Sequence, residues 1–229
     1  MSVLHTILNT FFPSTCVGCG EVLVGNEKQL CLSCLSQLPA THFSATPDNE
    51  AERMLIGKIP FVAVSAMLQF QHGNKTQRII HSMKFHGNSD LCLLMGRQMG
   101  LDLARSGRFD DIDLLLPVPL HWIRRLKRGY NQSELLCRGM SEVLGVPINT
   151  TALKRVRYTR KQSQRQRDKR QTNVENAFRT MHPEQLKNKH ILLVDDVMTT
   201  GATLTSCCDA LANVYSLRIS IATLSIATY

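Results

Sequence analysis

Residues 191–203 read ILLVDDVMTTGAT and join a short apolar strand to a helix through two acids and a Thr/Gly turn. The four apolar residues are typical of a strand buried on both faces of a parallel sheet. Asp195 and Asp196 follow at the carboxyl edge of that sheet, where α/β proteins bind their ligands. The N–H groups and hydroxyls of the turn, with the start of the helix, form a nest for a monophosphate, and Gly201 allows close approach. We therefore predict an anion site formed by Thr199, Thr200, Gly201, Ala202 and Thr203.

A plainer explanation of this segment stays open. A strand that simply ends in two acids before a capped helix needs no ligand. The acids are unsuited to phosphate, but they suit ribose hydroxyls or a Mg²⁺-linked sugar. The ligand interpretation therefore requires that the carboxylates are not buried in ion pairs and that the turn faces a cleft.

Strand-type and helix-type segments alternate along most of the chain. Apolar, β-prone runs predict strands over 61–70, 113–119, 190–195 and 217–227, with a further candidate over 147–156. Helical spacing predicts helices over 75–85, 91–104, 131–144 and 202–214, the third opening with the pattern of a capping box, Asn131 and Glu134. Such alternation implies right-handed βαβ units, so the expected fold is α/β, a mainly parallel sheet with flanking helices.

The size and composition leave room for one full domain and a small module. The chain has 229 residues, 43% of them hydrophobic, and no apolar run long enough to span a membrane. Residues 39–59 are polar and aperiodic, which predicts a linker; we expect an N-terminal helix and cysteine module over 1–45 and the larger domain over 46–229. Because residues 1–12 lack the basic stretch of an export signal, we expect a short amphipathic helix there and a cytoplasmic protein. The net charge of +9 favours phosphate-bearing partners.

Two Cys-x-x-Cys pairs stand near the start of the chain, eleven residues apart, at Cys16, Cys19, Cys31 and Cys34. Each pair can turn two thiolates toward one point, as tetrahedral Zn²⁺ requires, and Gly18 and Gly20 permit the tight turn around the first pair. With all four ligand positions filled, such a zinc ion would be structural. A redox dithiol and unrelated turn cysteines are the alternatives.

Two basic segments accompany the predicted anion site. Residues 121–132 place Arg124, Arg125, Lys127 and Arg128 beyond the end of another predicted strand; a solvated charged helix face is the alternative. Residues 154–170 hold nine Lys/Arg and one Asp without apolar periodicity, which predicts a mobile loop. That loop suits a flap closing over a polyanion or an arm gripping a nucleic-acid backbone.

The segment VDDVMTTGATL resembles the phosphoribosyl-pyrophosphate (PRPP) signature of type I phosphoribosyltransferases. The resemblance implies that Asp195 and Asp196 hold the ribose hydroxyls in catalysis, that the Thr/Gly turn holds the 5′-phosphate, and that Mg²⁺ binds with PRPP. It also implies, by analogy, that the loop carrying Arg124, Arg125 and Arg128 holds the pyrophosphate.

The order of the motifs from about Cys16 to Leu224 resembles the ComF/GntX family, which pairs a zinc ribbon with a phosphoribosyltransferase domain and is associated with DNA uptake in naturally competent bacteria. The resemblance rests on the four cysteines, PVPL with RGYNQSELL, the segment carrying Gln162 and Arg170, and VDDVMTTGAT. It implies a flexible loop with Arg160, Gln162 and Arg170. Arg165 stands where relatives tend to carry an apolar residue, which puts the packing of the closed loop in doubt.

Two functions follow as hypotheses. The first is a Mg²⁺-dependent phosphoribosyltransferase whose acceptor the sequence does not name, its specificity hood expected over 61–87. The second is a non-catalytic factor that binds single-stranded DNA through the basic loops, with PRPP as an effector if at all and competence proteins as partners. The oligomeric state is not visible in the sequence.

Overall fold

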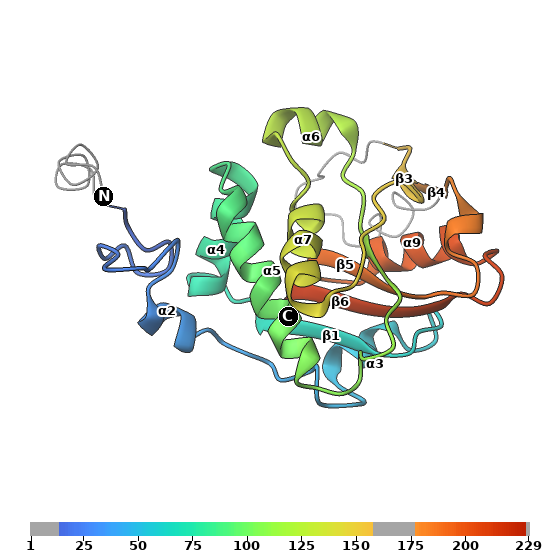
Figure 1. The fold of residues 1–229 in the computed structure, drawn as a ribbon, viewed down its shortest axis with the longest axis horizontal. Helices are drawn as coiled ribbons and strands as arrows, with labels where there is room; N and C mark the ends of the chain where they lie inside the picture. Colours follow the sequence, from blue (N-terminus) through green and yellow to red (C-terminus); the bar gives the residue numbers. More distant parts are fainter. Residues whose placement is uncertain (1–13, 158–176, 228–229) are drawn as a thin grey trace.

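The computed structural model describes residues 14–157 and 177–227, and its centre is a four-stranded parallel sheet (Figure 1). The strand order is β1-β6-β5-β2, with each neighbouring pair parallel. The strands span Val64–Gln69 (β1), Arg218–Ile226 (β6), His190–Met198 (β5) and Leu114–Pro117 (β2). The expected α/β class with a mainly parallel sheet is confirmed.

The helices and a small hairpin surround this sheet. The α-helices are α2 (Leu32–Ser36), α3 (Glu50–Leu55), α4 (Lys75–Phe85), α5 (Ser89–Ala104), α6 (Trp122–Arg128), α7 (Gln132–Leu144) and α9 (Ala202–Leu211), and η1 (Pro183–Gln185) is a 3₁₀ turn. The hairpin pairs β3 (Leu153–Arg155) with β4 (Phe178–Thr180) in antiparallel register.

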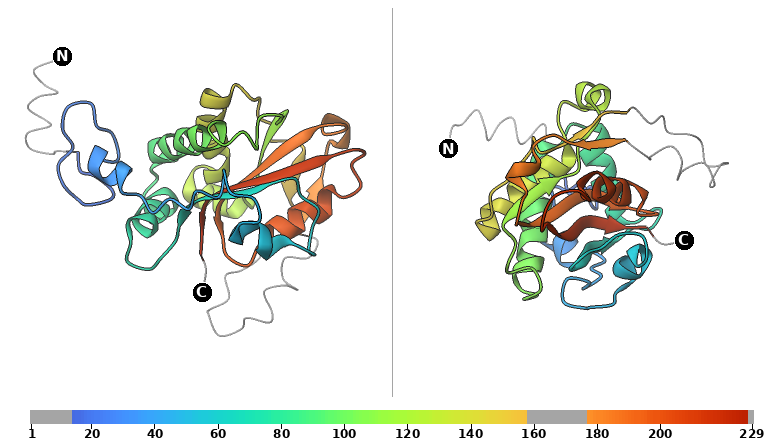
Figure 2. Two further views of the ribbon diagram at one scale, coloured as in Figure 1. Left: turned by 90° about the horizontal axis from the view of Figure 1, so that it is seen from below. Right: turned by 90° about the vertical axis from the view of Figure 1, so that its right-hand side faces the viewer.

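The sheet is buried on both faces because side chains of β5 alternate between two cores. Leu192 and Val194 join the cluster that includes α5 and α7, whereas Ile191 and Leu193 join the cluster that includes α3 and α9. A strand buried on both sides reads as a continuous apolar run, as this one does. Figure 2 shows the helices on either side of the sheet and the cysteine module extending from one end.

Helices α5 and α7 cross at very close range through two glycines. A Cβ at Gly139 would lie 2.3 Å from the carbonyl oxygen of Leu93, and one at Gly96 would lie 2.3 Å from that of Leu136. Since no side chain fits at that range, the helix backbones pack directly against each other. This contact fixes α7, whose first turn reaches the carboxyl edge of the sheet.

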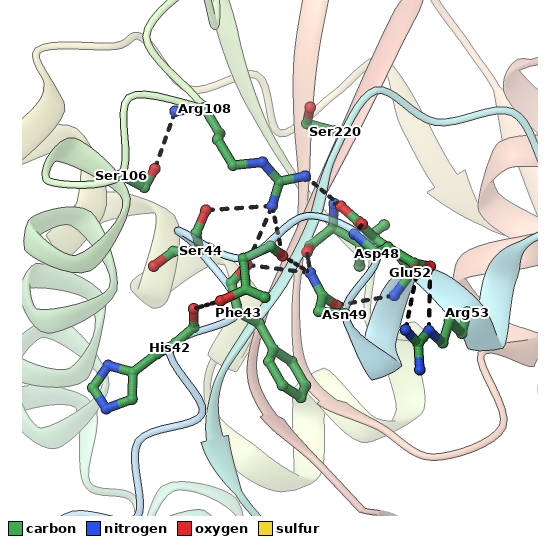
Figure 3. A network of polar contacts seen from close by, with 12 residues as sticks. His42, Phe43, Ser44, Asp48, Asn49, Glu52, Arg53, Ser106, Arg108 and Ser220 are labelled. Atoms are coloured by element: carbon green, nitrogen blue, oxygen red, sulfur yellow. Dashed lines mark hydrogen bonds and ion pairs between the residues drawn. The ribbon is translucent and has the colours of Figure 1, made fainter.

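Residues 39–59 are ordered rather than an irregular linker. Ala40 forms a bridge with Leu68 of β1, and α3 lies within the segment. Arg108 donates hydrogen bonds to three carbonyl groups of residues 43–46 and to the Glu52 carboxylate at 2.6 Å (Figure 3). Asn49 donates to the carbonyl group of Val64 at 2.9 Å. Polar side chains thus hold the segment, which an apolar pattern could not reveal.

Several predicted boundaries differ from the structure. Trp122–Arg128 is a helix where a loop was expected, because His121 caps it and Gly129 ends it with a φ of 79°. The candidate strand over 147–156 divides into a parallel bridge between Leu115 and Ile148 and strand β3. The helix expected over 202–214 ends at Leu211.

Strand β5 also runs further than its apolar residues. Val197 and Met198 pair with Ser225 and Ile226 of β6, so Asp195 and Asp196 lie within the strand rather than after it. The carboxyl end of β5 is therefore determined by its pairing with β6 and not by its own apolar residues.

Some predictions fall outside the described residues. These are the helix over 1–12 and most of the basic loop, including Arg160, Gln162, Arg165 and Arg170. Within the described ranges, no helix has both the length and the apolar character needed to cross a membrane.

Candidate functional site

The four paired cysteines converge on one point near the start of the chain. Their Sγ atoms all lie within 4.8 Å of one another, and those of Cys19 and Cys31 are 3.8 Å apart. Tetrahedral zinc with Zn–S bonds of about 2.3 Å requires sulfur–sulfur separations of about 3.8 Å, so this cluster has the size of a four-thiolate zinc site. All eight cysteines lie in the described ranges, and none of them forms a disulfide. Four protein ligands leave no open position, as in a structural site.

The backbone around Cys16 favours a thiolate. Its Sγ accepts hydrogen bonds from the N–H groups of Gly18 (3.4 Å) and Cys31 (3.3 Å). Burial raises the pKa of Cys16, but hydrogen bonds from surrounding N–H groups outweigh burial and lower it to about 6. At Cys34, burial and the neighbouring thiols raise the pKa to about 12. Ionising four adjacent thiols brings like charges together, which a bound cation offsets.

The glycines of the first pair have different roles. A Cβ at Gly18 would lie 2.8 Å from Cys34 Sγ, so Gly18 leaves room for a ligand atom. Gly20 has a φ of 85° and open space around it, so the predicted tight turn uses a left-handed backbone conformation at this glycine.

Helix α4 connects the cysteine module to the larger domain. The Arg78 guanidinium donates to the carbonyl oxygen of Gly18, between the first two cysteines. Just past the helix, Asn88 donates to the Gln29 side chain at 2.6 Å. The buried side chains of α4 share one apolar cluster with the cysteine module.

At the carboxyl end of the sheet, Asp195 is enclosed by its neighbours. Its Oδ1 accepts two hydrogen bonds, from the Ser133 hydroxyl at 3.0 Å and from the backbone N–H of Asp196 at 2.9 Å. Ser133 lies in the first turn of α7, and Asn131, the N-cap of that helix, donates to the carbonyl group of Val118 beyond β2 at 3.0 Å. Burial and the adjacent Asp196 charge raise the pKa of Asp195 to about 7. This carboxyl group therefore changes charge near neutral pH.

Asp196 forms an ion pair with Lys84 of α4. Lys84 Nζ lies 2.8 Å from Asp196 Oδ2, and the two side chains are 20% and 14% exposed. The condition that the acids stay out of buried ion pairs is thus only partly met, since the pair is mostly enclosed but reaches solvent. A partly hydrated ion pair can be exchanged for other partners at lower cost than a fully buried one.

The turn after β5 leads into a helix whose N-cap residue supplies no side-chain cap. Gly201 is the N-cap of α9, with a φ of 77°, and as a glycine it has no side chain to cap the helix; the Thr200 hydroxyl accepts a long hydrogen bond from the N–H of Ala202 at 3.4 Å. The other α-helices in the described ranges are capped by the side chains of Cys31, Asn49, Asn74, Asn88, His121 and Asn131. With a glycine as its N-cap, the start of α9 leaves N–H groups that suit an anion.

Helix α3 packs against this turn at Gly201. A Cβ at Gly201 would lie 2.6 Å from Cδ2 of Leu55, which is fully buried. Thr199 and Thr203 are half-buried and Thr200 is exposed. The turn is therefore held in place on one side and open to solvent at Thr200.

The three arginines assigned to pyrophosphate lie on α6 in different surroundings. Arg128 is half-buried and donates to Gln132 Oε1 at 2.9 Å. Burial lowers the pKa of Arg128, while the charge of Asp196 acts in the opposite direction, so the two side chains interact electrostatically. Arg125 is 61% exposed and faces Glu134 of α7 at 3.6 Å. The Glu134 carboxylate thus pairs with Arg125 and Arg138 instead of completing the expected capping box.

Arg155 and Lys84 are site residues that sequence reasoning missed. Burial and the charge of Arg124 lower the pKa of Arg155, and the charge of Asp195 opposes this, which places Arg155 of β3 in electrostatic contact with both. Its guanidinium lies 5.1 Å from the centre of the Phe178 ring. Arg155 lies where the candidate strand over 147–156 overlaps the basic segment 154–170, and Lys84 lies in the last turn of an ordinary amphipathic helix, so no motif singles out either residue.

Two family models match the chain. Residues 7–44 match the double zinc ribbon domain, and residues 131–225 match the phosphoribosyl transferase domain. The second match covers the acid pair, the turn and Ser133.

Named relatives cover more of the chain. DNA utilization protein YhgH of Escherichia coli (strain K12) is 33% identical over 181 residues, which are 78% of this chain and 75% of that protein. Competence protein F of Haemophilus influenzae is 32% identical over 130 residues, 55% of this chain and 57% of that protein. A solved structure of a hypothetical protein from Neisseria gonorrhoeae with bound ppGpp covers 61% of this chain and 69% of its own, at 16% identity and a TM-score of 0.40. That structural similarity is too weak to support a family assignment. Because YhgH aligns with most of both chains at this identity, the chain belongs to the ComF/GntX family, whose members join a zinc ribbon to a phosphoribosyltransferase domain.

Proposed function

We propose that this protein binds PRPP with Mg²⁺ and transfers the phosphoribosyl group to an acceptor. The observation that carries the proposal is the adjacency of two unlike sites on one strand and its turn. The acid pair Asp195/Asp196 suits hydroxyl groups, and the start of α9 a few residues later, with Gly201 as its N-cap, suits a phosphate. A ribose 5-phosphate has both groups.

In this proposal each end of the sugar has its own partners. The N–H groups and hydroxyls of the turn, Thr199, Thr200, Gly201, Ala202 and Thr203, hold the 5′-phosphate. Asp195 and Asp196 accept hydrogen bonds from the ribose hydroxyls, and the Asp196 carboxylate exchanges its contact with Lys84 for this ligand. Lys84 is then available to the negative charge of the substrate.

The cations on α6 hold the leaving group. Arg124, Arg125 and Arg128 are proposed to bind the pyrophosphate, and the charge of Arg128 interacts with that of Asp196. In the reaction the bond from C1′ to the pyrophosphate oxygen breaks and a bond from C1′ to the acceptor forms, while the acceptor loses a proton. Positioning and stabilisation of the departing charge supply the catalysis, so no protein nucleophile is needed.

The residues present fit the proposed magnesium. Two adjacent carboxylates without thiol or imidazole partners form an oxygen donor set, and Mg²⁺ is commonly held by one or two carboxylates together with substrate phosphates. Asp195 and Asp196 would hold it, and when bound it would neutralise charge on the pyrophosphate.

Calorimetric titration of the zinc-loaded chain with PRPP and Mg²⁺ tests the proposal. We expect binding by the wild-type chain and a loss of at least about a hundredfold in the double variant Asp195→Asn with Asp196→Asn, because both hydroxyl acceptors lose their charge. Asp209→Asn, which changes an exposed acid on α9, is the matched control and should bind normally. Equal affinity of the double variant and the wild type would refute the proposal. Release of pyrophosphate with a panel of nucleobases and amines then identifies the acceptor.

A second candidate function, single-stranded DNA binding, is favoured by the surface of α6. Trp122 and Leu126 are 63% and 76% exposed on a helix that also carries four basic residues, Arg124, Arg125, Lys127 and Arg128. The names of the relatives refer to DNA utilization and competence.

Salt dependence separates this candidate from the first. If α6 binds a DNA backbone, affinity should fall steeply with salt, and Arg125→Ala with Lys127→Ala should reduce the logarithmic slope by roughly 1 to 2. DNA binding that does not respond to salt would exclude this candidate and leave PRPP binding unaffected.

A further inference from the structure

The last turn of α4 carries an aromatic ring at the surface. Phe85 is 57% exposed, although the apolar face of α4 formed by Ile79, Ile80 and Met83 is buried. Phe85 lies off that face, next to Lys84, which contacts Asp196. Single exposed apolar side chains are common, so exposure by itself implies no function.

The surroundings of Phe85 are specific. The His81 ring lies one helical turn earlier, with its centre 4.7 Å from that of Phe85 and a tilt of 40°. The His86 ring packs edge-on against His81 at 5.1 Å. The guanidinium carbon of Arg128 lies 5.8 Å from the centre of the Phe85 ring, which brings α6 beside the end of α4 (Figure 1). The ring is thus framed by the His81 imidazole and the Arg128 cation.

Hydrogen bonds fix this arrangement. The Tyr130 hydroxyl and the Gln132 amide both donate to the carbonyl oxygen of Met83, at 2.7 and 3.2 Å. Gln132 also accepts from Arg128. Arg128 and Phe85 are therefore held relative to each other through one backbone carbonyl group, and little ordering is needed when a ligand binds.

We propose that the Phe85 ring, framed by His81 and Arg128, is a stacking surface for a purine or pyrimidine ring. Heteroaromatic rings stack on exposed aromatic side chains, and a guanidinium adds cation–π attraction. Arg128 links this surface to the acid pair, because its guanidinium lies over the Phe85 ring and its charge acts on Asp196. Assigning this ring to the acceptor rests on the proposed function; a base within single-stranded DNA has the same chemistry.

Binding to matched ligands tests the stacking surface. The full zinc-loaded chain is titrated with free nucleobases in the presence of PRPP, with an oligothymidylate of about twelve nucleotides, and with an abasic oligomer of equal length. We expect Phe85→Ala to weaken the base-containing ligands by roughly tenfold and to leave the abasic oligomer unchanged. Tyr215→Ala is the control, because Tyr215 is 68% exposed and lies under a cation, Lys187, at 5.3 Å.

A spectroscopic variant gives an independent answer if Phe85→Ala folds poorly. The chain has a single tryptophan, Trp122, so Phe85→Trp combined with Trp122→Phe places one fluorophore in the proposed surface. Its fluorescence should be quenched by base-containing ligands and not by the abasic oligomer. Quenching by free bases alone would identify the bound ring as the acceptor, and quenching by the oligonucleotide alone would identify it as a DNA base. Either result supports Phe85 as a stacking surface.

The inference is overturned if Phe85→Ala binds every base-containing ligand as the wild type does, or if the tryptophan shows no quenching. PRPP affinity should be unchanged in Phe85→Ala. A wild-type chain that fails to bind PRPP would contradict the proposed function without affecting the comparison of oligonucleotide and abasic oligomer.

Discussion

In the proposed function, Asp195 is the residue whose environment has the most direct effect on PRPP binding. Its carboxyl group is enclosed beside a second acid, which holds its pKa at about 7 in place of the ordinary value of 3.8. The group therefore keeps its proton below neutral pH. A protonated carboxyl group accepts hydrogen bonds from ribose hydroxyls less well than a carboxylate does.

This environment predicts a pH-dependent affinity for PRPP with Mg²⁺. With a pKa of about 7, the ionised fraction of Asp195 rises from about a tenth near pH 6 to about nine tenths near pH 8. We therefore expect binding to be about tenfold weaker near pH 6 and to release a proton there. Calorimetry in buffers with different ionisation enthalpies measures both quantities.

The Ser133→Ala variant controls for titration of PRPP itself, since free phosphate groups titrate near pH 6 in every experiment. The hydroxyl of Ser133 stabilises the ionised form of Asp195, so its removal should move the loss of affinity to higher pH. Identical pH profiles for the variant and the wild type would mean that Asp195 does not control binding.

At the scale of secondary structure, the crossing of α5 and α7 positions this site. Helix α7 brings Ser133 to Asp195, and its packing on α5 depends on the missing side chains at Gly96 and Gly139.

We expect Gly139→Ala to destabilise the protein by about 2 kcal/mol or more, because the new methyl group meets backbone atoms that cannot move aside. PRPP affinity should fall with it. Urea denaturation measures the free energy of unfolding. Arg138→Ala, at an exposed position of the same helix, should change stability by less than about 0.5 kcal/mol. Similar values for the two variants would show that the close crossing is not needed.

The elements that the sequence revealed are those with a strong local pattern. Helix α4 has the predicted bounds, and β5 begins at the predicted His190, because apolar periodicity and continuous burial are visible in the residues themselves. Helix α3 was missed because six residues carry too little periodicity. The start of α6 was missed because a histidine provides its cap in place of the usual Ser, Asp or Asn.

The same distinction applies to the site. Asp195, Asp196 and the turn are contiguous and form a motif, so the sequence could single them out. Lys84, Ser133 and Arg155 come from three other elements and approach the acids only through the tertiary fold. Residues of this kind cannot be recognised from one sequence.

At the scale of the whole molecule, α4 joins the zinc ribbon to the acid pair. Arg78 contacts the ribbon at Gly18, and Lys84 on the same helix contacts Asp196. The ribbon and the larger domain also share an apolar cluster. Metal in the ribbon should therefore stabilise more than the ribbon itself.

We expect one zinc ion per chain by elemental analysis, and a loss on the order of 4 kcal/mol in the free energy of unfolding when a chelator removes it. Cys19→Ser should lose most of its zinc and show the same loss, and adding zinc back to the chelated wild type should restore stability. A chain that contains no zinc, or one indifferent to the chelator, would contradict the structural role of the four cysteines.

The most direct test of the central claim is a crystal structure of the zinc-loaded protein with PRPP and Mg²⁺. We expect the 5′-phosphate to lie against the N–H groups that begin α9, the ribose hydroxyls to bind Asp195 and Asp196, and Lys84 to be released from Asp196. A bound ligand whose phosphate lies away from the turn of residues 199–203, with the Lys84–Asp196 pair intact, would contradict the claim.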